Sequence, residues 1–452
     1  MKIIVVGCGK IGATIVESLV AEGHDVTAID NNSVVVNDMV EMYDCMGICG
    51  SGTDCNTLTE SGVEESELFV AVTGSDEFNM LACFMAKSLG AKHTIARIRN
   101  PEYNDRNLGF IRQNLGLSMA INPELLAAKE MFSVLQLPSA TKVEKFSRRN
   151  FEMVEIVVKK DSPIAGMSLI DMRKKYTAKF LVCAVERDEE VFVPDGNFVL
   201  ETGDRISITS SPFEIAKLLK LIGLDVKQAQ NVMILGASKT SYYLAKMLIT
   251  AGTAVKVIDP SVERCEKFSE VLPEAIIING DVAAQQVLIE EGIRSMDAFV
   301  SLTGIDEENI LMSLFASSQN VPKVISKINR DEFGGLAEQI GIETIVSPRH
   351  IIADVLVRYA RGLQNSMGSK METLYKLMDG KAEVLEFLIE PDCEVADIPL
   401  KSIKLKKNVL IAGIIRARKT IIPSGDDKIL AGDTVIVLAA GQRINDISDI
   451  IK

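Results

Sequence analysis

Most landmarks of this 452-residue chain occur twice at a nearly constant interval, and this repeat limits the fold more than any other feature. Gly7 recurs as Gly236, 229 positions later (236 minus 7), and Asp30 recurs at the same interval as Asp259. The other recurring segments are Thr73–Glu77 with Thr303–Glu307 and Gly203-Asp204 with Gly432-Asp433. A fixed interval between similar segments marks a repeated architecture. We therefore predict two equivalent halves, each covering about half of the chain.

The first part of each half alternates short apolar runs with helical patterns. In the first half the expected strands are 2–6, 25–30, 46–50, 68–73, 93–98 and 117–121. The expected helices are 10–22, 33–42, 54–62, 76–90, 102–115 and 123–136. This alternation predicts an α/β fold, a doubly wound, Rossmann-like parallel sheet with helices on both faces.

The second part of each half is different and predicts a small α+β module. Strand-like runs dominate it, at 151–158, 180–186, 191–196 and 205–209, and again at 384–389, 409–416, 420–423 and 434–438. We therefore expect four domains, with a Rossmann-like fold and a module in each half. Their expected limits are 1–140, 141–227, 228–367 and 368–452.

Composition excludes several classes of protein. The formal net charge of −13 argues against unaided binding of nucleic acid. No apolar stretch reaches the roughly 18 residues that a membrane-spanning helix needs. Cys45, Cys49 and Cys55 lie close together, but they lack Cys-x-x-Cys spacing and the chain has only three histidines. We therefore expect no metal site.

The strongest motif is Gly7-Cys8-Gly9-Lys10-Ile11-Gly12, which follows the apolar run 3–6 and opens a helical pattern. In this context Gly-x-Gly-x-x-Gly is typical of dinucleotide binding. The first glycine permits a tight turn, the second lets the backbone approach a pyrophosphate, and the third lets the helix pack on the strand. The free N–H groups at the helix start would face the phosphates. The alternative is a glycine turn that only packs a helix.

An acidic residue at the next strand end strengthens this prediction. Asp30 follows the glycine loop by about 20 residues, the position from which an acid bonds the hydroxyls of an adenosine ribose. Asp54 ends the loop 50–54 after the third strand, and this loop could line an adenine pocket. Both loops lie at carboxyl ends of parallel strands, where open α/β sheets bind ligands.

Two further strand ends supply candidate contacts. Thr73 and Gly74 are placed to touch the ribose or adenine of a bound nucleotide, whereas Ser75 or Asp76 could simply cap the next helix. Arg97 ends the fifth strand and could meet a phosphate. The alternative for this arginine is a surface ion pair with an aspartate.

The second glycine loop departs from the pattern. It reads Gly236-Ala237-Ser238-Lys239-Thr240-Ser241, so serines replace the second and third glycines. A side chain at Ser238 restricts the approach of the backbone to a pyrophosphate, although Asp259 remains. Gly236, Ser238, Lys239, Thr240 and Asp259 are candidate contacts of a weaker, altered or empty site.

A catalytic set for hydride transfer is missing from the sequence. Such an enzyme needs a proton donor beside the nicotinamide. Tyr242-Tyr243-Leu244-Ala245-Lys246 contains Tyr-x-x-x-Lys, but it lies directly after a phosphate loop instead of far downstream. We therefore expect no catalytic residues and favour a nucleotide sensor over the alternative, an NAD-dependent oxidoreductase.

These residues resemble those of the TrkA-type peripheral potassium-uptake proteins, which are built from two RCK (regulator of conductance of potassium) units. The resemblance covers the whole chain and is carried by these segments: Gly7–Gly12, Asp30, Thr73–Glu77 with Asn79, Ile95–Arg99, Gly203-Asp204 and Gly432-Asp433.

The resemblance implies a regulatory role without catalysis. It implies NAD(H) and adenine nucleotides, ATP or ADP, as ligands. It also implies a homotetramer on the cytoplasmic face of the membrane, under a TrkH- or TrkG-like potassium-translocating subunit. In this family the folds pair through crossover helices, expected here at about 102–136 and 331–362.

Overall fold

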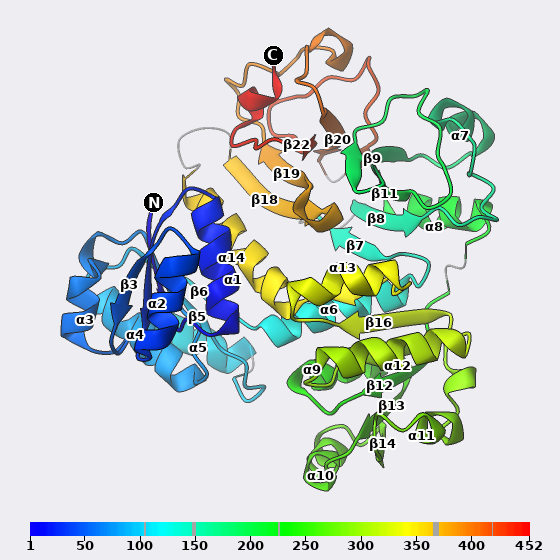
Figure 1. Ribbon diagram of the computed structural model, residues 1–452. Coiled ribbons are helices and arrows are strands. Elements are labelled where there is room, and N and C mark those ends of the chain that lie inside the picture. The colour runs from blue at the N-terminus through cyan, green and yellow to red at the C-terminus, as the bar shows by residue number, and fades with distance from the viewer. Residues whose placement is uncertain (104, 147–150, 225–226, 365–369, 418) are drawn as a thin grey trace.

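Four β-sheets follow one another along the chain in the computed structural model (Figure 1), which describes all residues except 104, 147–150, 225–226, 365–369 and 418. Two are parallel sheets of six strands, and each is followed by an antiparallel sheet of five strands. The predicted class, two Rossmann-like folds that each precede a small α+β module, is confirmed.

The first parallel sheet has the strand order β3-β2-β1-β4-β5-β6. Its strands are β1 (Lys2–Val6), β2 (Asp25–Asp30), β3 (Met46–Cys49), β4 (Leu68–Ala71), β5 (His93–Arg97) and β6 (Met119–Ile121). Its helices are α1 (Lys10–Ala21), α2 (Ser33–Met42), α3 (Cys55–Glu60), α4 (Asp76–Ser88) and α5 (Asp105–Leu115), with the short turn η1 (Val63–Glu65). The strand order reverses between β1 and β4, and such a switch point forms a crevice at the carboxyl ends of the strands.

The second parallel sheet repeats this order as β14-β13-β12-β15-β16-β17. Its strands are β12 (Asn231–Leu235), β13 (Ala254–Asp259), β14 (Ile276–Asn279), β15 (Ala298–Ser301), β16 (Lys323–Lys327) and β17 (Ile345–Val346). Its helices are α9 (Lys239–Thr250), α10 (Val262–Val271), α11 (Gln285–Glu290), α12 (Asp306–Ser318) and α13 (Asp331–Gln339), with the turn η2 (Ile293–Ser295). The duplication inferred from the sequence is therefore present in the topology.

Two long helices join the halves by exchanging places. α6 (Pro123–Gln136) follows the first sheet but packs on α9 of the second fold, and Ala127 and Met131 belong to the second fold's core. α14 (Pro348–Gln364) follows the second sheet but packs on α1 of the first fold (Figure 1). Each fold therefore completes its core with a helix from the other half, so the two folds of one chain pair through the crossover helices.

The two antiparallel modules also share a core. The first contains β7 (Lys142–Lys145), β8 (Glu152–Val157), β9 (Leu181–Arg187), β10 (Glu190–Phe192) and β11 (Arg205–Ser210), with α7 (Leu169–Lys175) and α8 (Pro212–Leu221). The second contains β18 (Lys370–Leu377), β19 (Ala382–Leu388), β20 (Val409–Arg416), β21 (Lys419–Ile421) and β22 (Thr434–Ala440), with turns η3 (Met378–Gly380), η4 (Leu400–Ser402) and η5 (Ile447–Ile450). Phe151 from the first module and Ala412 from the second lie in one buried cluster.

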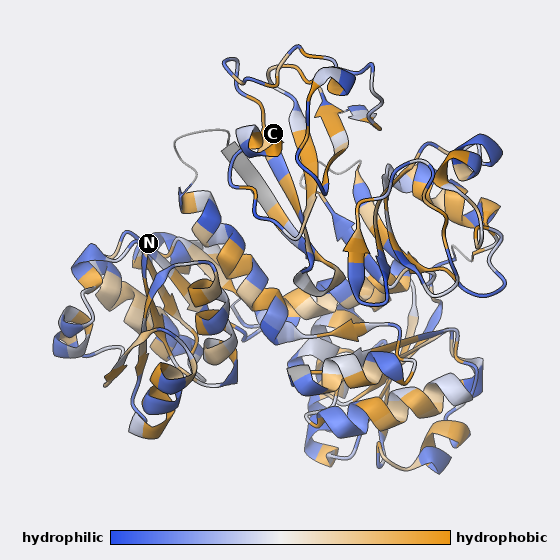
Figure 2. Cartoon of the chain, turned by 45° about the horizontal axis from the view of Figure 1, so that its top comes forward, coloured by the Kyte–Doolittle hydropathy of each residue, from blue (hydrophilic) through white to orange (hydrophobic). Residues whose placement is uncertain are grey.

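The first strand of each module escaped sequence analysis. β7 reads Lys-Val-Glu-Lys and has no apolar run, because it is an edge strand whose pairing to β8 is all that defines it. β18 occupies the same edge position beside β19. In the rest of the molecule the strands are mostly hydrophobic and lie inside, whereas hydrophilic residues lie on the outer faces of the helices and in the loops (Figure 2). Among the described residues, none of the helices combines the length and apolar character required to cross a membrane.

Candidate functional site

The loop between β1 and α1 separates its three glycines by role. Gly7 has a φ of +95°, and a Cβ there would lie 2.9 Å from Thr73. A Cβ on Gly12 would lie 1.9 Å from the Gly7 carbonyl oxygen. A Cβ on Gly9, the N-cap residue of α1, would meet no atom within 4 Å. Gly7 and Gly12 therefore serve the fold, whereas Gly9 faces open space beside the helix start.

Asp30 ties this loop to the end of β2. Its Oδ2 accepts a hydrogen bond of 2.8 Å from the N–H of Cys8, and its Oδ1 accepts one of 3.0 Å from the N–H of Asn32. The carboxylate is half-buried and faces the crevice between β1 and β4. Burial, together with the Asp30 charge, raises the pKa of the Cys8 thiol to about 12, so this cysteine is no thiolate nucleophile at neutral pH.

A buried asparagine holds the opposite wall. Asn79 accepts hydrogen bonds from the N–H and the hydroxyl of Thr73, and its Nδ2 donates to the carbonyl oxygen of Arg97 at 2.9 Å. Arg97 Nη2 lies 3.1 Å from Glu124 Oε1 at the start of α6. Its Nε has no hydrogen-bond partner among the described residues. Arg97 therefore keeps a buried donor group at the edge of the crevice.

Most predicted contacts of the first fold converge on one cavity of about 620 Å³. Those that line it are Gly7, Gly9, Lys10, Ile11, Asp30, Thr73, Gly74 and Arg97. Sequence analysis missed Asn31 and Phe78, which also line it. Phe78 lies in the first turn of α4, a position that only its closeness to the loop at residues 73–75 could have suggested. A volume of this size is typical of a small-molecule site.

Three predicted contacts do not line the cavity. Cys8 and Gly12 lie behind the loop, where Cys8 donates to Asp30 and Gly12 packs on Gly7. Asp54 is exposed and caps α3, because its Oδ2 accepts from the N–H and the hydroxyl of Thr57.

The alternatives left open for the strand ends are resolved in part. Ser75 is the N-cap of α4. Asp76 is buried and accepts hydrogen bonds of 2.8 Å from the N–H groups of Arg99 and Asn100, so it holds the loop after β5 instead of capping a helix. The arginine–aspartate pair considered for Arg97 is made by Arg99 and Asp76, at 3.4 Å.

The second fold has an equivalent loop, but the carboxylate of its acid, Asp259, already forms an ion pair with an arginine. Asp259 is 2% exposed, and its carboxylate accepts from the N–H of Ala237 at 2.7 Å and from Arg264 Nε at 2.9 Å. Ser238 caps α9, and the Ser241 hydroxyl donates to the carbonyl oxygen of Gly236 at 2.5 Å.

Two side chains differ at the equivalent of the crevice in the second fold. Val282 stands where the first fold has Gly52, and it is 3% exposed within the local core. Lys327 replaces Arg97, and its Nζ lies 3.4 Å from the carbonyl oxygen of Leu302. Lys239 begins α9, and Thr240 is buried. Asp259 and Ser238 thus bond to neighbouring residues of the second fold, Ala237, Arg264 and Ser241.

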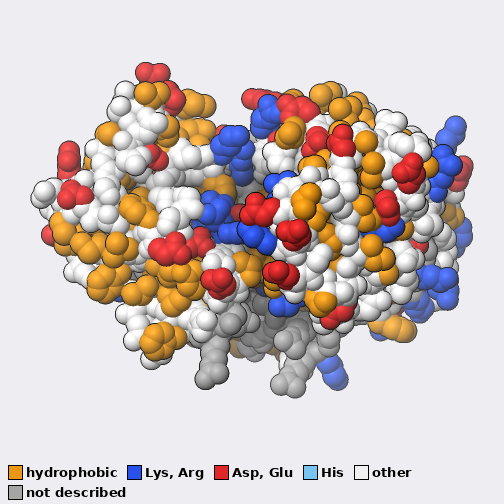
Figure 3. All heavy atoms as spheres, turned by 90° about the horizontal axis from the view of Figure 1, so that it is seen from below, with side chains coloured by type: hydrophobic (Ala, Val, Ile, Leu, Met, Phe, Trp, Pro, Cys, Tyr) orange, Lys and Arg blue, Asp and Glu red, His pale blue; other side chains and the backbone are white. Residues whose placement is uncertain are grey.

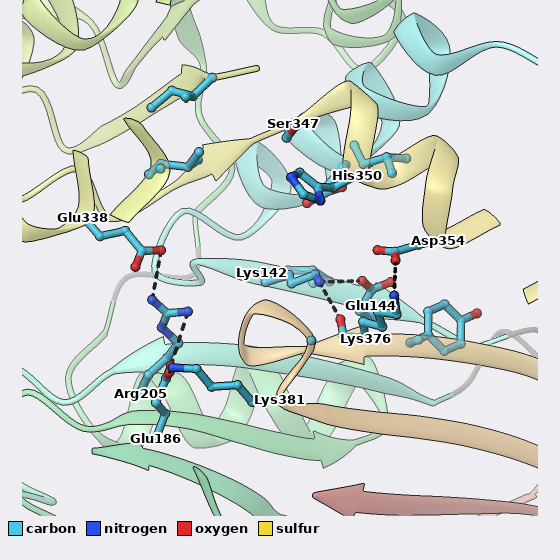
Figure 4. Close-up of a pocket in the computed structure, with 18 of the residues that line it drawn as sticks. Lys142, Glu144, Glu186, Arg205, Glu338, Ser347, His350, Asp354, Lys376 and Lys381 are labelled. Atoms are coloured by element: carbon cyan, nitrogen blue, oxygen red, sulfur yellow. Dashed lines mark hydrogen bonds and ion pairs between the residues drawn. The ribbon is translucent and has the colours of Figure 1, made fainter. Parts of the chain in front are cut away.

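A larger cleft of about 1620 Å³ lies where α13 and α14 face the two modules (Figure 4). Three of its ion pairs join different domains: Lys376 with Asp354, Arg205 with Glu338, and Lys381 with Glu186. Lys142 pairs with Glu144 on its own strand, β7. Within the described part of the chain, three or more His, Cys, Asp or Glu residues nowhere gather in a way that could hold a metal ion.

Comparisons with known proteins cover the whole chain. The TrkA-N domain matches residues 3–123 and 232–348, and the TrkA-C domain matches residues 153–223 and 384–452. The Trk system potassium uptake protein TrkA homolog of Archaeoglobus fulgidus is 32% identical over 453 residues, 100% of both chains. TrkA of Haemophilus influenzae is 28% identical and covers 98% of this chain and 96% of its own length.

Solved structures show the same fold. The chain superposes on the GsuK channel bound to NAD with a TM-score of 0.64 and 18% identity, over 97% of this chain and 77% of the channel. The GsuK RCK domain gives a TM-score of 0.63 at 18% identity, over 97% of this chain and 92% of that domain. GsuK bound to ADP gives 0.51 at 14% identity, over 79% and 68%. With its tandem TrkA-N and TrkA-C domains, the chain belongs to the TrkA family of Trk potassium uptake proteins.

Proposed function

We propose that this chain is a nucleotide-sensing regulatory subunit of a Trk-type potassium uptake system. The observation that carries this proposal is the open cavity of the first fold, where Gly9, Asp30 and Arg97 surround the start of α1. NAD(H), ATP and ADP are the proposed ligands. Two solved GsuK structures that share the fold are of the protein bound to NAD and bound to ADP.

The chain's own residues bind and orient such a ligand without reacting with it. The N–H groups at the start of α1 face the place of a pyrophosphate, and an anion there is stabilised by the helix dipole. Asp30 accepts hydrogen bonds from two ribose hydroxyls but repels a 2′-phosphate, and neither Asn31 nor Asn32 offers a cation. NAD(H) therefore binds more tightly than NADP(H).

ATP and NADH compete for this cavity and place their phosphates differently. ATP carries more charge over a shorter length than a dinucleotide. Its terminal phosphate would lie nearer Arg97, which now pairs with Glu124 on the crossover helix α6. A ligand shifts a conformational equilibrium only by binding one state better than the other. The different demand on Arg97 supplies such a difference, with a typical coupling of about 1–3 kcal/mol.

A membrane potassium-translocating subunit, similar to TrkH or TrkG, is the proposed partner, and a homotetramer on the cytoplasmic face of the membrane is the proposed assembly. Exposed hydrophobic side chains support self-association. They lie on α4 and α5 of the first fold and on or beside α13 of the second: Leu81, Phe84, Phe110, Leu336 and Ile340. Figure 3 shows hydrophobic side chains gathered on the first fold, and Lys and Arg along the groove between the two folds. Large exposed apolar patches mark interaction surfaces.

The test is calorimetric titration of the purified chain with NADH, NADPH, ATP and ADP, followed by potassium flux through the reconstituted partner. We expect NADH to bind, ATP to displace it, and the two ligands to give different fluxes. Equal fluxes at saturation would leave a scaffold that merely holds nucleotide. Oxidation of NADH with candidate substrates, followed at the nicotinamide absorbance band, would favour the oxidoreductase instead.

A further inference from the structure

The C-terminal end of α1, the helix that borders the cavity of the first fold, contacts a buried arginine of α14. α1 begins at Lys10 beside the cavity and ends at Ala21, so the same helix that faces the phosphates carries Glu22 as its C-cap. Glu22 accepts two hydrogen bonds from Arg361 of α14, Nε to Oε2 at 2.7 Å and Nη2 to Oε1 at 2.8 Å.

The other edge of the same guanidinium binds the second module. Arg361 Nη1 donates to Glu383 Oε2 at 2.8 Å and Nη2 donates to Glu383 Oε1 at 2.9 Å, on strand β19. The side chains of Arg361, Glu22 and Glu383 are only 3%, 8% and 12% exposed. Both forks are bidentate, the arrangement that best fixes the relative position of two groups.

The electrostatics favour keeping this cluster intact. Burial acts to raise the pKa of Glu22, but the hydrogen bonds and positive charge of Arg361 outweigh it, so the pKa lies below its ordinary value. Removing one member of a buried ion cluster leaves an uncompensated charge away from water, which is strongly unfavourable. Arg443 of the second module also donates to the carbonyl oxygen of Ala21. The end of α1 is therefore held by the second module and cannot move independently of it.

The repeat supplies an internal comparison. α9 packs on α6 as α1 packs on α14, but the residue equivalent to Arg361 is Gln136, and the C-cap equivalent to Glu22 is Ala251. Gln136 Nε2 is buried and has no hydrogen-bond partner in the described part of the chain. Among the residues that the structure describes, the charged connection is therefore found at α1 and not at α9.

We propose that Arg361 couples the nucleotide state of the first fold to the second module. An anion bound at the start of α1 pulls on a helix of 12 residues, which moves as one body. Glu22 at its far end carries that displacement through Arg361 to Glu383, and β19 moves with it. This coupling rests on the proposed nucleotide binding, and it assigns the second module as the place where the bound ligand is read out.

Amide hydrogen exchange of β19, with and without saturating NADH, tests this coupling on the full chain. In the wild type we expect exchange in residues 382–388 to change about fivefold or more, the low end of typical allosteric couplings. Glu22→Gln and Glu383→Gln should abolish this response while NADH affinity stays within about twofold, because neither residue touches the cavity. Arg361→Lys keeps the charge, loses both forks and should reduce the response.

Glu152→Gln is the matched control, because Glu152 holds the position on β8 that Glu383 holds on β19 and belongs to the half without the connection. It should respond as the wild type does. A full response in Glu22→Gln would overturn the proposal, as would a wild type that binds NADH without a change in β19. If Glu22→Gln does not fold, Glu383→Gln decides, since it leaves α1 intact. A wild type that binds no nucleotide rejects the proposed function and this coupling together.

Discussion

The two Rossmann-like folds share a strand order, a glycine loop and an acid at the end of the second strand, but the surroundings of that acid differ. In the first, Asp30 bonds two backbone N–H groups and still faces the cavity. In the second, Arg264 binds Asp259, which is buried. The same backbone therefore carries a candidate binding site in one half and an internally bonded structure in the other.

Few substitutions separate these outcomes. Ser241 puts a hydroxyl where Gly12 leaves none, and that hydroxyl binds the carbonyl oxygen of the loop's own first glycine. Val282 fills the position of Gly52 with a core side chain. Duplication thus preserved the architecture, which depends on many apolar contacts, while the crevice depended on a few small residues that could change one at a time.

The largest effect should follow from Gly9→Ala. The added methyl lies in open space next to the helix start, so it would block a pyrophosphate without disturbing the fold. We expect NADH affinity to fall by roughly 3 kcal/mol, the upper range for forcing an extra methyl into a packed contact, with an unchanged thermal midpoint. Titration calorimetry and thermal unfolding measure the two. Ser238→Ala is the control in the second loop, and normal NADH binding by Gly9→Ala would refute the assigned phosphate loop.

The next effect is a pH dependence of stability. It arises at the start of the fifth strand of each parallel sheet, where the first fold has His93 and the second has Lys323. Lys323 is 3% exposed, its Nζ donates to the carbonyl oxygen of Ala140 at 2.6 Å, and burial lowers its pKa to about 8. Between about pH 8 and 10.4 the unfolded chain binds more protons at this lysine, so stability rises with pH. Below about pH 8 the lysine is charged in both states and the contribution stays flat.

Lys323→Met isolates this contribution. The stability of the wild type relative to the variant should rise by up to about 3 kcal/mol across that window, at 1.36 kcal/mol per pKa unit. Thermal midpoints of both proteins from pH 7 to 10.5 give the measurement. A constant difference over this range would show that Lys323 has an ordinary pKa.

A smaller effect separates the two acids. Asp30→Ala should weaken NADH binding by about 1–3 kcal/mol, the scale of hydrogen bonds to a charged group. Asp259→Ala should leave NADH binding unchanged and instead lower stability, because it leaves the N–H of Ala237 without its acceptor and removes the ion pair with Arg264. Calorimetry with NADH and NADPH checks both variants. Equal affinity of the wild type for the two cofactors would contradict the role of Asp30.

The smallest effect is expected for Ser241→Ala. Loss of the hydroxyl bonds to Gly236 and Ser238 should cost about 1 kcal/mol of stability, with no change in NADH affinity or stoichiometry. Chemical unfolding measures the first and titration the second. Weaker NADH binding in this variant would mean that the second loop also contacts the ligand, and the contrast between the halves would then fail.

Local patterns accounted for much of the fold. The duplication, the alternation of strands and helices and the family were all predicted from the sequence and are confirmed. The candidate contacts remain predictions, although eight of those in the first fold line one cavity. Phe78 and Asn31 were missed, because nothing in their local pattern separates a residue that lines a cavity from one that covers a helix.

By itself, the sequence determined the two halves, the position of each glycine loop and the serines that replace two glycines in the second loop, because these depend on residues close together in the chain. Only the tertiary structure decided that α6 and α14 each pack on the fold of the other half. It also decided that Arg97 pairs with Glu124 and that Arg264 pairs with Asp259. It alone joined Glu22 to Arg361, which lie 339 positions apart. Contacts over such distances follow from how the faces of the folded elements pack, and the periodicity of a sequence carries no record of which faces meet.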